Sequence, residues 1–388
     1  MVNKKCLIAA AGSGKTTYLV NQIWEHFRNA SAILVTFTTI NQQNICKKIK
    51  NKFGYHPSRI KVMGWYEFVF KYFILPYKTD ALEELNTIPI SLIFDSDYSR
   101  TIQTKDGRMF SRYKKDDVKG KFFTEGWRIH KDLVSEFACL CSKGNESSIA
   151  KRLEESADII CFDESQDFGG YDFSIIKIIT KLYSGTVILA TDPRQHIYTT
   201  TNYGGKYSGR IDTFIQNQIW TKKHKFIEID DTTLSKSHRC IEPICALATT
   251  LFSDMAPTES CTCPDCVARR NQYSGLQGVF AVFEDDIDKF VDIYKPLNLI
   301  YDRREHSLVI GEFMTMGDSK GTESDVILLY PTDGMAKFLF KDRDTVLTDM
   351  TRNRLYVGIT RARYLLGIVF RNKYKFKNAL MPFWQKLL

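Results

Sequence analysis

The chain has 388 residues, 44% of them hydrophobic, which is enough for two domains with sizeable cores. Its 54 lysines and arginines exceed its 45 aspartates and glutamates, giving a net charge of +9 that suits either a polyanionic partner or a solvated surface. No apolar run approaches the ~18 residues of a membrane span, and the apolar stretch near the N-terminus runs straight into a glycine loop, so we expect no signal peptide. The 10 cysteines lie mostly in apolar runs, so we expect reduced, buried thiols in a cytoplasmic protein. The absence of a long apolar run predicts no membrane partner.

The first predicted elements are a strand at residues 6–8, a glycine loop at 9–17 and a helix that begins there. The glycines let backbone amides point inward, and the helix N-terminus adds partial positive charge, so the loop can hold phosphates. Lys15 would reach the β- and γ-phosphates, and the Thr16 hydroxyl would ligate Mg²⁺. Because Ala9 replaces the first glycine of the usual pattern, the alternative is a glycine turn that has arisen by chance and binds no phosphate. The predicted nucleotide-binding residues are Ala11, Gly12, Ser13, Gly14, Lys15, Thr16 and Thr17.

Two further strands, at residues 31–37 and 60–63, end in hydroxyl and aromatic side chains. Such strand ends suit a single strand of nucleic acid, with Phe37 stacking on a base, Thr38 contacting phosphate and Trp65 adding a second aromatic surface. Ordinary strand-end chemistry explains them equally well. From about residue 75 to 150 the pattern weakens and predicts an inserted subdomain, partly helical at 131–141, with no recognisable chemistry.

Residues 158–162 restore a buried strand, and two carboxylates follow it. In a phosphate-loop ATPase, Asp163 would hold Mg²⁺ and Glu164 would polarise the attacking water as general base. Another strand, at 186–190, ends in a segment where Gln195 could sense a γ-phosphate. Tyr198 could pass that state to bound nucleic acid.

The order of these motifs resembles that of the UvrD/Rep-type superfamily 1 helicases. Those proteins carry an A-x-x-G-x-G-K-T loop, in which Ala9 is usual, and T-F-T-N, D-E-x-Q-D and G-D-x-x-Q-x-I-Y motifs. The most specific marker is the pair Gln166-Asp167 after Asp163-Glu164.

The second half continues the resemblance. Residues 234–239 are similar to the family's L-x-x-N-Y-R motif, which implies that Arg239 is an arginine finger and that His238 replaces the aromatic that stacks on adenine. Residues 314–323 are similar to M-T-x-H-x-x-K-G-x-E, which implies that Glu323 contacts the ribose and Thr315 the nucleic-acid backbone. Residues 356–362 match Y-V-A/G-x-T-R-A, which implies that Arg361 is a second arginine finger. Strands are predicted at residues 227–230, 278–283, 326–330 and 365–370.

One feature of the second half lies outside the resemblance. Cys261, Cys263 and Cys266 have C-x-C-x₂-C spacing, which brings three thiolates into one tight turn and suits zinc. Free thiols in a surface loop are the alternative. Four other cysteines are open candidates for a fourth ligand: Cys139, Cys141, Cys240 and Cys245.

The resemblance implies an α/β fold of two RecA-like parallel-sheet domains. The first would span residues 1–205, with a mostly helical insertion at about 75–150, and the second residues 206–388, with a small cysteine-containing insertion at about 252–275. It also implies an ATP- and Mg²⁺-dependent translocase or helicase that moves 3′→5′ on single-stranded DNA, with RNA not excluded. The alternative is a nucleic-acid-stimulated ATPase switch, or the motor subunit of a larger nuclease, defence or repair complex, which would need a protein partner. The small insertions favour that alternative somewhat.

Overall fold

The computed structural model describes residues 4–26, 29–94, 101–103, 109–111, 114, 117–197, 205–305, 307–374 and 380–385. The chain forms two compact units. The first unit consists of Met1–Cys6, Thr16–Thr191 and Tyr198–Ile229. The second consists of Leu7–Lys15, Asp192–Ile197 and Asp230–Leu388, so it includes most of the glycine loop.

A six-stranded sheet with the order β10-β1-β9-β8-β2-β3 organises the first unit. Its central strands β2 and β8 are buried along their whole length, as expected for strands covered on both faces, and the pairs β3–β2, β2–β8 and β8–β9 are parallel. The strands are β1 (Lys4–Ile8), β2 (Ala32–Thr36), β3 (Ile60–Gly64), β8 (Ile159–Phe162), β9 (Thr186–Thr191) and β10 (Glu228–Asp230).

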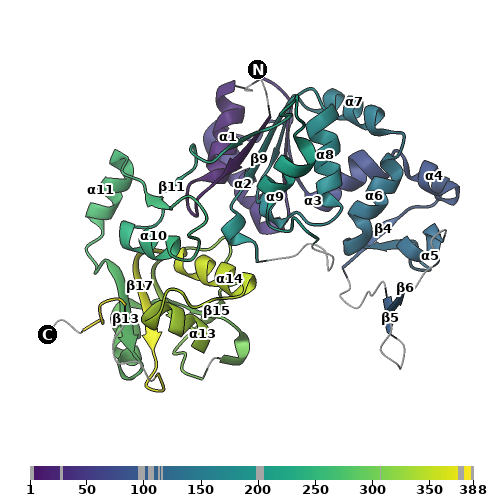
Figure 1. The fold of residues 1–388 in the computed structure, drawn as a ribbon. Coiled ribbons are helices and arrows are strands. Elements are labelled where there is room, and N and C mark those ends of the chain that lie inside the picture. Colours follow the sequence, from purple (N-terminus) through teal and green to yellow (C-terminus); the bar gives the residue numbers. More distant parts are fainter. Residues whose placement is uncertain are drawn as a thin grey trace. The chain divides into compact units, whose positions relative to one another are not determined.

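Helices flank this sheet, with α1 on one side and α8 on the other in the view of Figure 1. The 15-residue α2 begins after Thr38, whose hydroxyl accepts a hydrogen bond from the Asn41 amide, and ends at Gly54 in the left-handed conformation (φ = +79°). The helices next to the sheet strands are α1 (Lys15–His26), α2 (Thr39–Phe53), α3 (Trp65–Val69) and α8 (Asp172–Leu182).

The segment predicted as an insertion contains short elements and two longer helices. The helix expected at 131–141 is present as α6, and the strand pairs β4–β7 and β5–β6 are separate from the main sheets. The elements are α4 (Lys78–Ala81), β4 (Ser91–Ile93), β5 (Thr101–Gln103), β6 (Met109–Ser111), α5 (Val118–Phe122), β7 (Arg128–His130), α6 (Val134–Ser142) and α7 (Glu146–Ser156).

Residues after the boundary predicted at 206 still pack with the first unit. Phe214 of α9 (Ile211–Phe214) stacks on Phe173 of α8 with ring centroids 4.7 Å apart, and β10 joins the six-stranded sheet. The second unit therefore resumes at Asp230.

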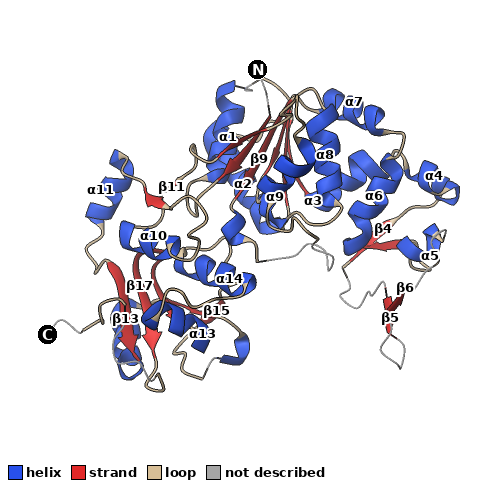
Figure 2. Ribbon diagram, in the orientation of Figure 1, coloured by secondary structure: helices blue, strands red, loops and turns tan. Residues whose placement is uncertain are grey.

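A five-stranded, all-parallel sheet with the order β13-β17-β16-β14-β15 forms the second unit; β13 and β17 lie side by side in Figure 2. Alternate residues of β16 enter two different cores: Ile327 and Leu329 enter one, and Val326 and Leu328 the other. The strands are β13 (Gly278–Phe283), β14 (Leu297–Ile300), β15 (Phe313–Thr315), β16 (Ser324–Tyr330) and β17 (Ala362–Phe370). The helices are α10 (Glu242–Thr249), α11 (Pro264–Gln272), α12 (Ile287–Tyr294), α13 (Asp333–Ala336) and α14 (Asp349–Ile359), and a two-strand sheet pairs β11 (Lys236–Ser237) with β12 (Glu259–Ser260).

Both sheets confirm the predicted α/β class of two parallel-sheet domains of the RecA-like kind. Within the described ranges, every helix is too short or too polar to cross a membrane.

Candidate nucleotide and nucleic-acid sites

The glycine loop has the backbone that a phosphate cradle needs. Gly12 and Gly14 have φ values of +73° and +83°, a region that side chains with a Cβ rarely adopt, and Lys15 begins α1 directly after them. Ser13 is buried, and its hydroxyl has no hydrogen-bond partner among the described residues. A buried hydroxyl without a partner, at the N-terminus of a helix, suits a phosphate oxygen as acceptor.

The two residues predicted to hold Mg²⁺ are in direct contact. The Thr16 hydroxyl donates a 2.6 Å hydrogen bond to Asp163 Oδ2, which joins the start of α1 to the end of β8. Hydroxyl and carboxylate oxygens are the ligands that Mg²⁺ prefers, and neighbouring oxygens of an octahedral site are about 2.9 Å apart. The chemistry of these two side chains therefore fits this ion, which Thr16 and Asp163 would hold.

Glu164, the predicted general base, has a strained backbone and a defined side-chain partner. Its φ of +57° and ψ of +41° are left-handed values, uncommon outside glycine. Its carboxylate accepts a hydrogen bond from the amide of Gln166, which is fully buried and whose oxygen accepts from the Thr191 hydroxyl at 3.4 Å. Gln166 thus fixes Glu164 relative to the neighbouring strand end, a role that its motif position did not reveal.

The segment after β9 carries a buried polar network. Gln195 donates to Asp192 Oδ2 at 2.7 Å, and Arg361 Nη2 donates to Gln195 Oε1 at 3.4 Å. Arg361 is 2% exposed and also donates to the carbonyls of Val357 and Thr322. The two residues expected to sense and neutralise the γ-phosphate are therefore in contact.

Sequence reasoning missed two members of this network, Arg194 and Tyr356. Arg194 donates to Asp192 Oδ1 at 2.8 Å and to the carbonyl of Ala9 at 2.9 Å. The Tyr356 hydroxyl donates to Asp192 and accepts from the Ala11 amide, both at 3.3 Å. Burial alone would lower the pKa of Arg194, but the Asp192 carboxylate reverses the shift and keeps the guanidinium charged. The signals in the sequence were an arginine three residues after the strand end and the tyrosine that begins the motif at residues 356–362.

Arg239, the predicted arginine finger, lies beside the glycine loop. A Cβ added to Gly12 would come within 2.6 Å of Arg239 Cβ, and the His238 amide donates to the Gly12 carbonyl at 2.9 Å. The guanidinium donates to Glu323 at 2.7 Å and to the Thr360 carbonyl at 3.1 Å. Burial raises the pKa of Glu323, but its contacts with Arg363 and Arg239 outweigh this and lower the pKa to about 2. Glu323, expected at the ribose, therefore holds both arginines as a carboxylate.

The predicted nucleic-acid residues have different exposures. Phe37 is half-buried against Trp65 and Phe168, with ring centroids 5.9 and 5.2 Å away. Thr38 is exposed and caps α2. Thr315 is half-buried at the end of β15, and its hydroxyl accepts from the Asp318 amide at 3.0 Å. Tyr198 lies outside the described residues.

Trp65 corrects the sequence-based prediction. Its side chain is 1% exposed, and its indole nitrogen donates to the buried Asp172 at 2.9 Å, so the ring has no face available to a base. The strand predicted to present it ends at Gly64, and Trp65 instead begins α3 and points into the core.

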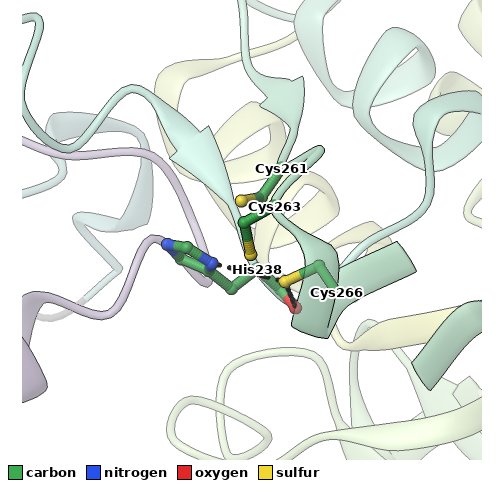
Figure 3. Close-up of side chains that lie close together, drawn as sticks. All are labelled: His238, Cys261, Cys263 and Cys266. Atoms are coloured by element: carbon green, nitrogen blue, oxygen red, sulfur yellow. Dashed lines mark hydrogen bonds between the residues drawn. The ribbon is translucent and has the colours of Figure 1, made fainter. Parts of the chain in front are cut away.

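The cysteine motif gathers as predicted, but with a different fourth side chain. The ligand atoms of Cys261, Cys263, Cys266 and His238 all lie within 4.8 Å of one another (Figure 3). None of the four cysteines considered as a fourth ligand belongs to this group; Cys139 and Cys141 lie on α6 of the first unit. His238, predicted to stack on adenine, instead has Nδ1 3.4 Å from Cys266 Sγ.

Comparisons with known proteins place the chain near helicase structures at low similarity. No protein-family model and no curated protein matches the sequence. Among solved structures, the helicase of PRRSV aligns at 14% identity with a TM-score of 0.45, over 98% of this chain and 55% of that one. Arterivirus nonstructural protein 10, a helicase solved in complex with DNA, aligns at 14% identity with a TM-score of 0.42, over 95% of this chain and 60% of that one. The chain spans little more than half the length of these two proteins.

Proposed function

We propose that the chain hydrolyses ATP with Mg²⁺ and couples hydrolysis to movement along single-stranded nucleic acid. The observation that carries the proposal is the 2.6 Å contact between Thr16 and Asp163, next to a loop whose glycines have positive φ. A hydroxyl at the start of a helix and a carboxylate at a strand end form the Mg²⁺ site of phosphate-loop ATPases. The order of the remaining motifs, and their resemblance to the UvrD/Rep-type helicases, extends the proposal from nucleotide hydrolysis to a motor.

Each site residue has a role in this proposal. Bound Mg²⁺ supplies charge neutralisation at the phosphates, and Thr16 and Asp163 are its protein ligands. Lys15 binds the β- and γ-phosphates, and Glu164, held by Gln166, accepts the proton of the attacking water. Arg239 and Arg361 offset developing negative charge on the γ-phosphate, and Gln195, in contact with Arg361, responds to its presence.

Phe37, Thr38 and Thr315 are the proposed contacts to nucleic acid. Phe37 provides a partly exposed ring for base stacking, and the two threonines provide hydroxyls for the backbone. DNA as the substrate and 3′→5′ movement follow from the resemblance alone; RNA is the competing substrate.

An ATPase switch, or the motor subunit of a larger nuclease, defence or repair complex, is the second candidate. The short segment between Arg239 and β13 favours this candidate, because it holds only α10, the short strand β12 and α11. Parts that contact duplex would be expected in such insertions. Strand separation by the isolated chain supports the helicase, whereas stimulated hydrolysis without unwinding supports the switch or subunit.

The first experiment measures ATP hydrolysis with and without single-stranded DNA or RNA. Removing the general base in Glu164→Gln, or the phosphate ligand in Lys15→Ala, should lower the stimulated rate by about 10²–10⁴-fold. Glu155→Gln and Lys47→Ala change exposed residues of α7 and α2 and should keep the wild-type rate. Hydrolysis that ignores both nucleic acids would exclude translocation by the isolated chain.

A further inference from the structure

We propose that Cys261, Cys263, Cys266 and His238 bind one structural zinc ion. Three thiolates and an imidazole are a typical ligand set for structural zinc, which is four-coordinate and tetrahedral. Among the described residues, this is the group of cysteine, histidine and acidic side chains whose ligand atoms converge closely enough to hold a metal ion. Figure 3 shows the three sulfur atoms and the imidazole ring close together, with Nδ1 of His238 toward the sulfur of Cys266.

The separation of the ligand atoms suits the ion. With Zn–S bonds of about 2.3 Å and a Zn–N bond of about 2.0 Å, tetrahedral ligand atoms lie roughly 3.5–3.8 Å apart. The four atoms here all lie within 4.8 Å of one another, and Nδ1 of His238 is already 3.4 Å from Cys266 Sγ.

Backbone pairing explains why His238 joins cysteines more than 20 residues away in sequence. Strands β11 and β12 pair in parallel with Ser237 opposite Ser260, and the Cys261 amide donates to the Ser237 carbonyl at 2.8 Å. His238 directly follows β11 and Cys261 directly follows β12. Because the two strands are parallel, both residues lie at the same end of the strand pair.

Helix α11 positions the other two cysteines. Cys263 is its N-cap residue, Pro264 occupies the first helical turn, and Cys266 lies within that turn. The N-terminal end of a helix stabilises negative charge, so it favours the thiolate forms that bind zinc. Cys261 and Cys266 are buried, while Cys263 is half-buried and His238 is exposed, which leaves a path for the ion to enter.

Two arginines of α11 form an outer shell around the cluster. Arg269 Nη2 lies 3.5 Å from Cys266 Sγ and also donates to the His238 carbonyl, and Arg270 donates to the Cys261 carbonyl at 2.8 Å. Zinc with three thiolates carries a net charge of −1, so a guanidinium beside a sulfur offsets it. Such outer-shell partners orient the ligands and tune metal affinity.

Zinc at this position would also fix the chain just before Arg239. His238 directly precedes Arg239, and the His238 amide donates a hydrogen bond to the carbonyl of Gly12 in the glycine loop. A metal bound to the imidazole would therefore hold the residue that precedes the predicted arginine finger. This consequence for hydrolysis rests on the proposed function, whereas zinc binding does not.

The direct test is the metal content of the untagged, purified full chain. We expect about one zinc per chain by elemental analysis. Cys266→Ser and His238→Ala should lower zinc affinity by at least the ~10–100-fold that loss of an outer-shell partner costs. Cys139→Ser and Cys46→Ser, which change half-buried cysteines on α6 and α2, should retain the zinc. Far-UV circular dichroism checks that each variant is folded.

Wild-type protein provides a second measurement that does not depend on variant folding. Chelation followed by Co²⁺ addition should produce the intense visible bands of tetrahedral thiolate coordination, and added Zn²⁺ should abolish them. Absence of zinc together with absence of these bands would overturn the proposal in favour of free thiols. Iron with acid-labile sulfide, or a disulfide within the cluster as isolated, would also overturn it.

The effect on Arg239 needs a separate comparison. His238→Cys offers a fourth thiolate, so it should restore both zinc binding and the kcat of ATP hydrolysis that His238→Ala loses. If His238→Cys binds zinc but its kcat stays as low as that of His238→Ala, the imidazole acts on the nucleotide and the positioning role is wrong. Zinc content is measured independently, so failure of the ATPase proposal leaves the metal site testable.

Discussion

Gly12 is a position where both backbone angle and space require glycine. Its φ is +73°, and an added Cβ would meet Arg239 Cβ at 2.6 Å and Ser237 Oγ at 2.9 Å. Two segments more than 220 residues apart in sequence can therefore lie this close together only because Gly12 has no Cβ. No local pattern in the loop predicts that contact.

A matched pair of substitutions separates the two requirements. Gly54 has nearly the same angle, φ = +79°, but open space around its Cβ position. Gly54→Ala should cost about 1–2 kcal/mol from the left-handed backbone alone, and Gly12→Ala should cost more because Arg239 must also move. Thermal unfolding of both variants measures the difference. Equal losses would mean that the loop yields freely and that the close approach to Arg239 is unimportant.

Gln166 is the second residue whose importance lies in its contacts. It is fully buried between Glu164 and Thr191. A hydrogen bond to a charged group contributes about 1.5–3 kcal/mol, so Gln166→Leu should lower kcat for ATP hydrolysis by roughly 10–100-fold. Nucleotide affinity should change little, because Gln166 acts through its contact with Glu164, the proposed general base.

Steady-state hydrolysis and nucleotide binding test this prediction together. Gln43→Leu, at an exposed position of α2, is the control and should behave as wild type. Unchanged kcat in folded Gln166→Leu would show that Glu164 is positioned by other contacts.

At the scale of elements, the end of β3 decides which aromatic side chains are available. Because the strand ends at Gly64, Trp65 begins α3 and turns into the core, where Asp172 accepts hydrogen bonds from its indole and from the Ser135 hydroxyl. Phe37, at the end of β2, covers Trp65 and remains partly exposed. Two aromatic residues at neighbouring strand ends thus have different roles.

Trp65→Phe should therefore affect stability and not binding. It leaves Asp172 without its indole donor, a loss of about 1–3 kcal/mol, while affinity for a single-stranded oligonucleotide stays at the wild-type value. Phe37→Ala should weaken that affinity by the ~1–3 kcal/mol of one stacked base, and Phe37→Tyr should preserve it. Fluorescence anisotropy with a labelled oligonucleotide, beside thermal melts, distinguishes the two; weaker binding by folded Trp65→Phe would restore Trp65 to the nucleic-acid surface.

At the scale of the whole molecule, the charge of +9 has a consequence for binding. Neutralising phosphates releases counterions, so the affinity for single strands should fall as salt rises. A plot of the logarithm of the binding constant against the logarithm of the salt concentration should have a slope of about −0.7 per phosphate contacted, or about −2.8 for four contacts. Oligonucleotide affinity measured between low and high salt gives the slope. Nucleotide affinity in the same buffers is the control, and salt-independent oligonucleotide binding would contradict a backbone-contacting surface.

The sequence alone determined the features that depend on residue identity at short spacing. The glycine loop at 9–17, the carboxylates after β8 and the parallel α/β class all follow from local pattern: glycines at fixed spacing and buried strands followed by polar ends. The contact of Thr16 with Asp163 follows as well, because the carboxyl ends of parallel strands share one edge of a sheet.

Tertiary structure alone decided the roles that depend on partners distant in the chain. The pairing of β11 with β12 turned His238 from a predicted adenine contact into the fourth member of the cysteine cluster, and the packing of Phe214 on Phe173 kept residues 211–229 with the first unit. The contact of Arg194 with the carbonyl of Ala9, 185 residues earlier in the chain, is likewise set by tertiary structure. The physical reason is that periodicity indicates which face of a helix or strand is buried. It does not indicate which distant residue packs against that face, because contacts between distant segments are not encoded in local spacing.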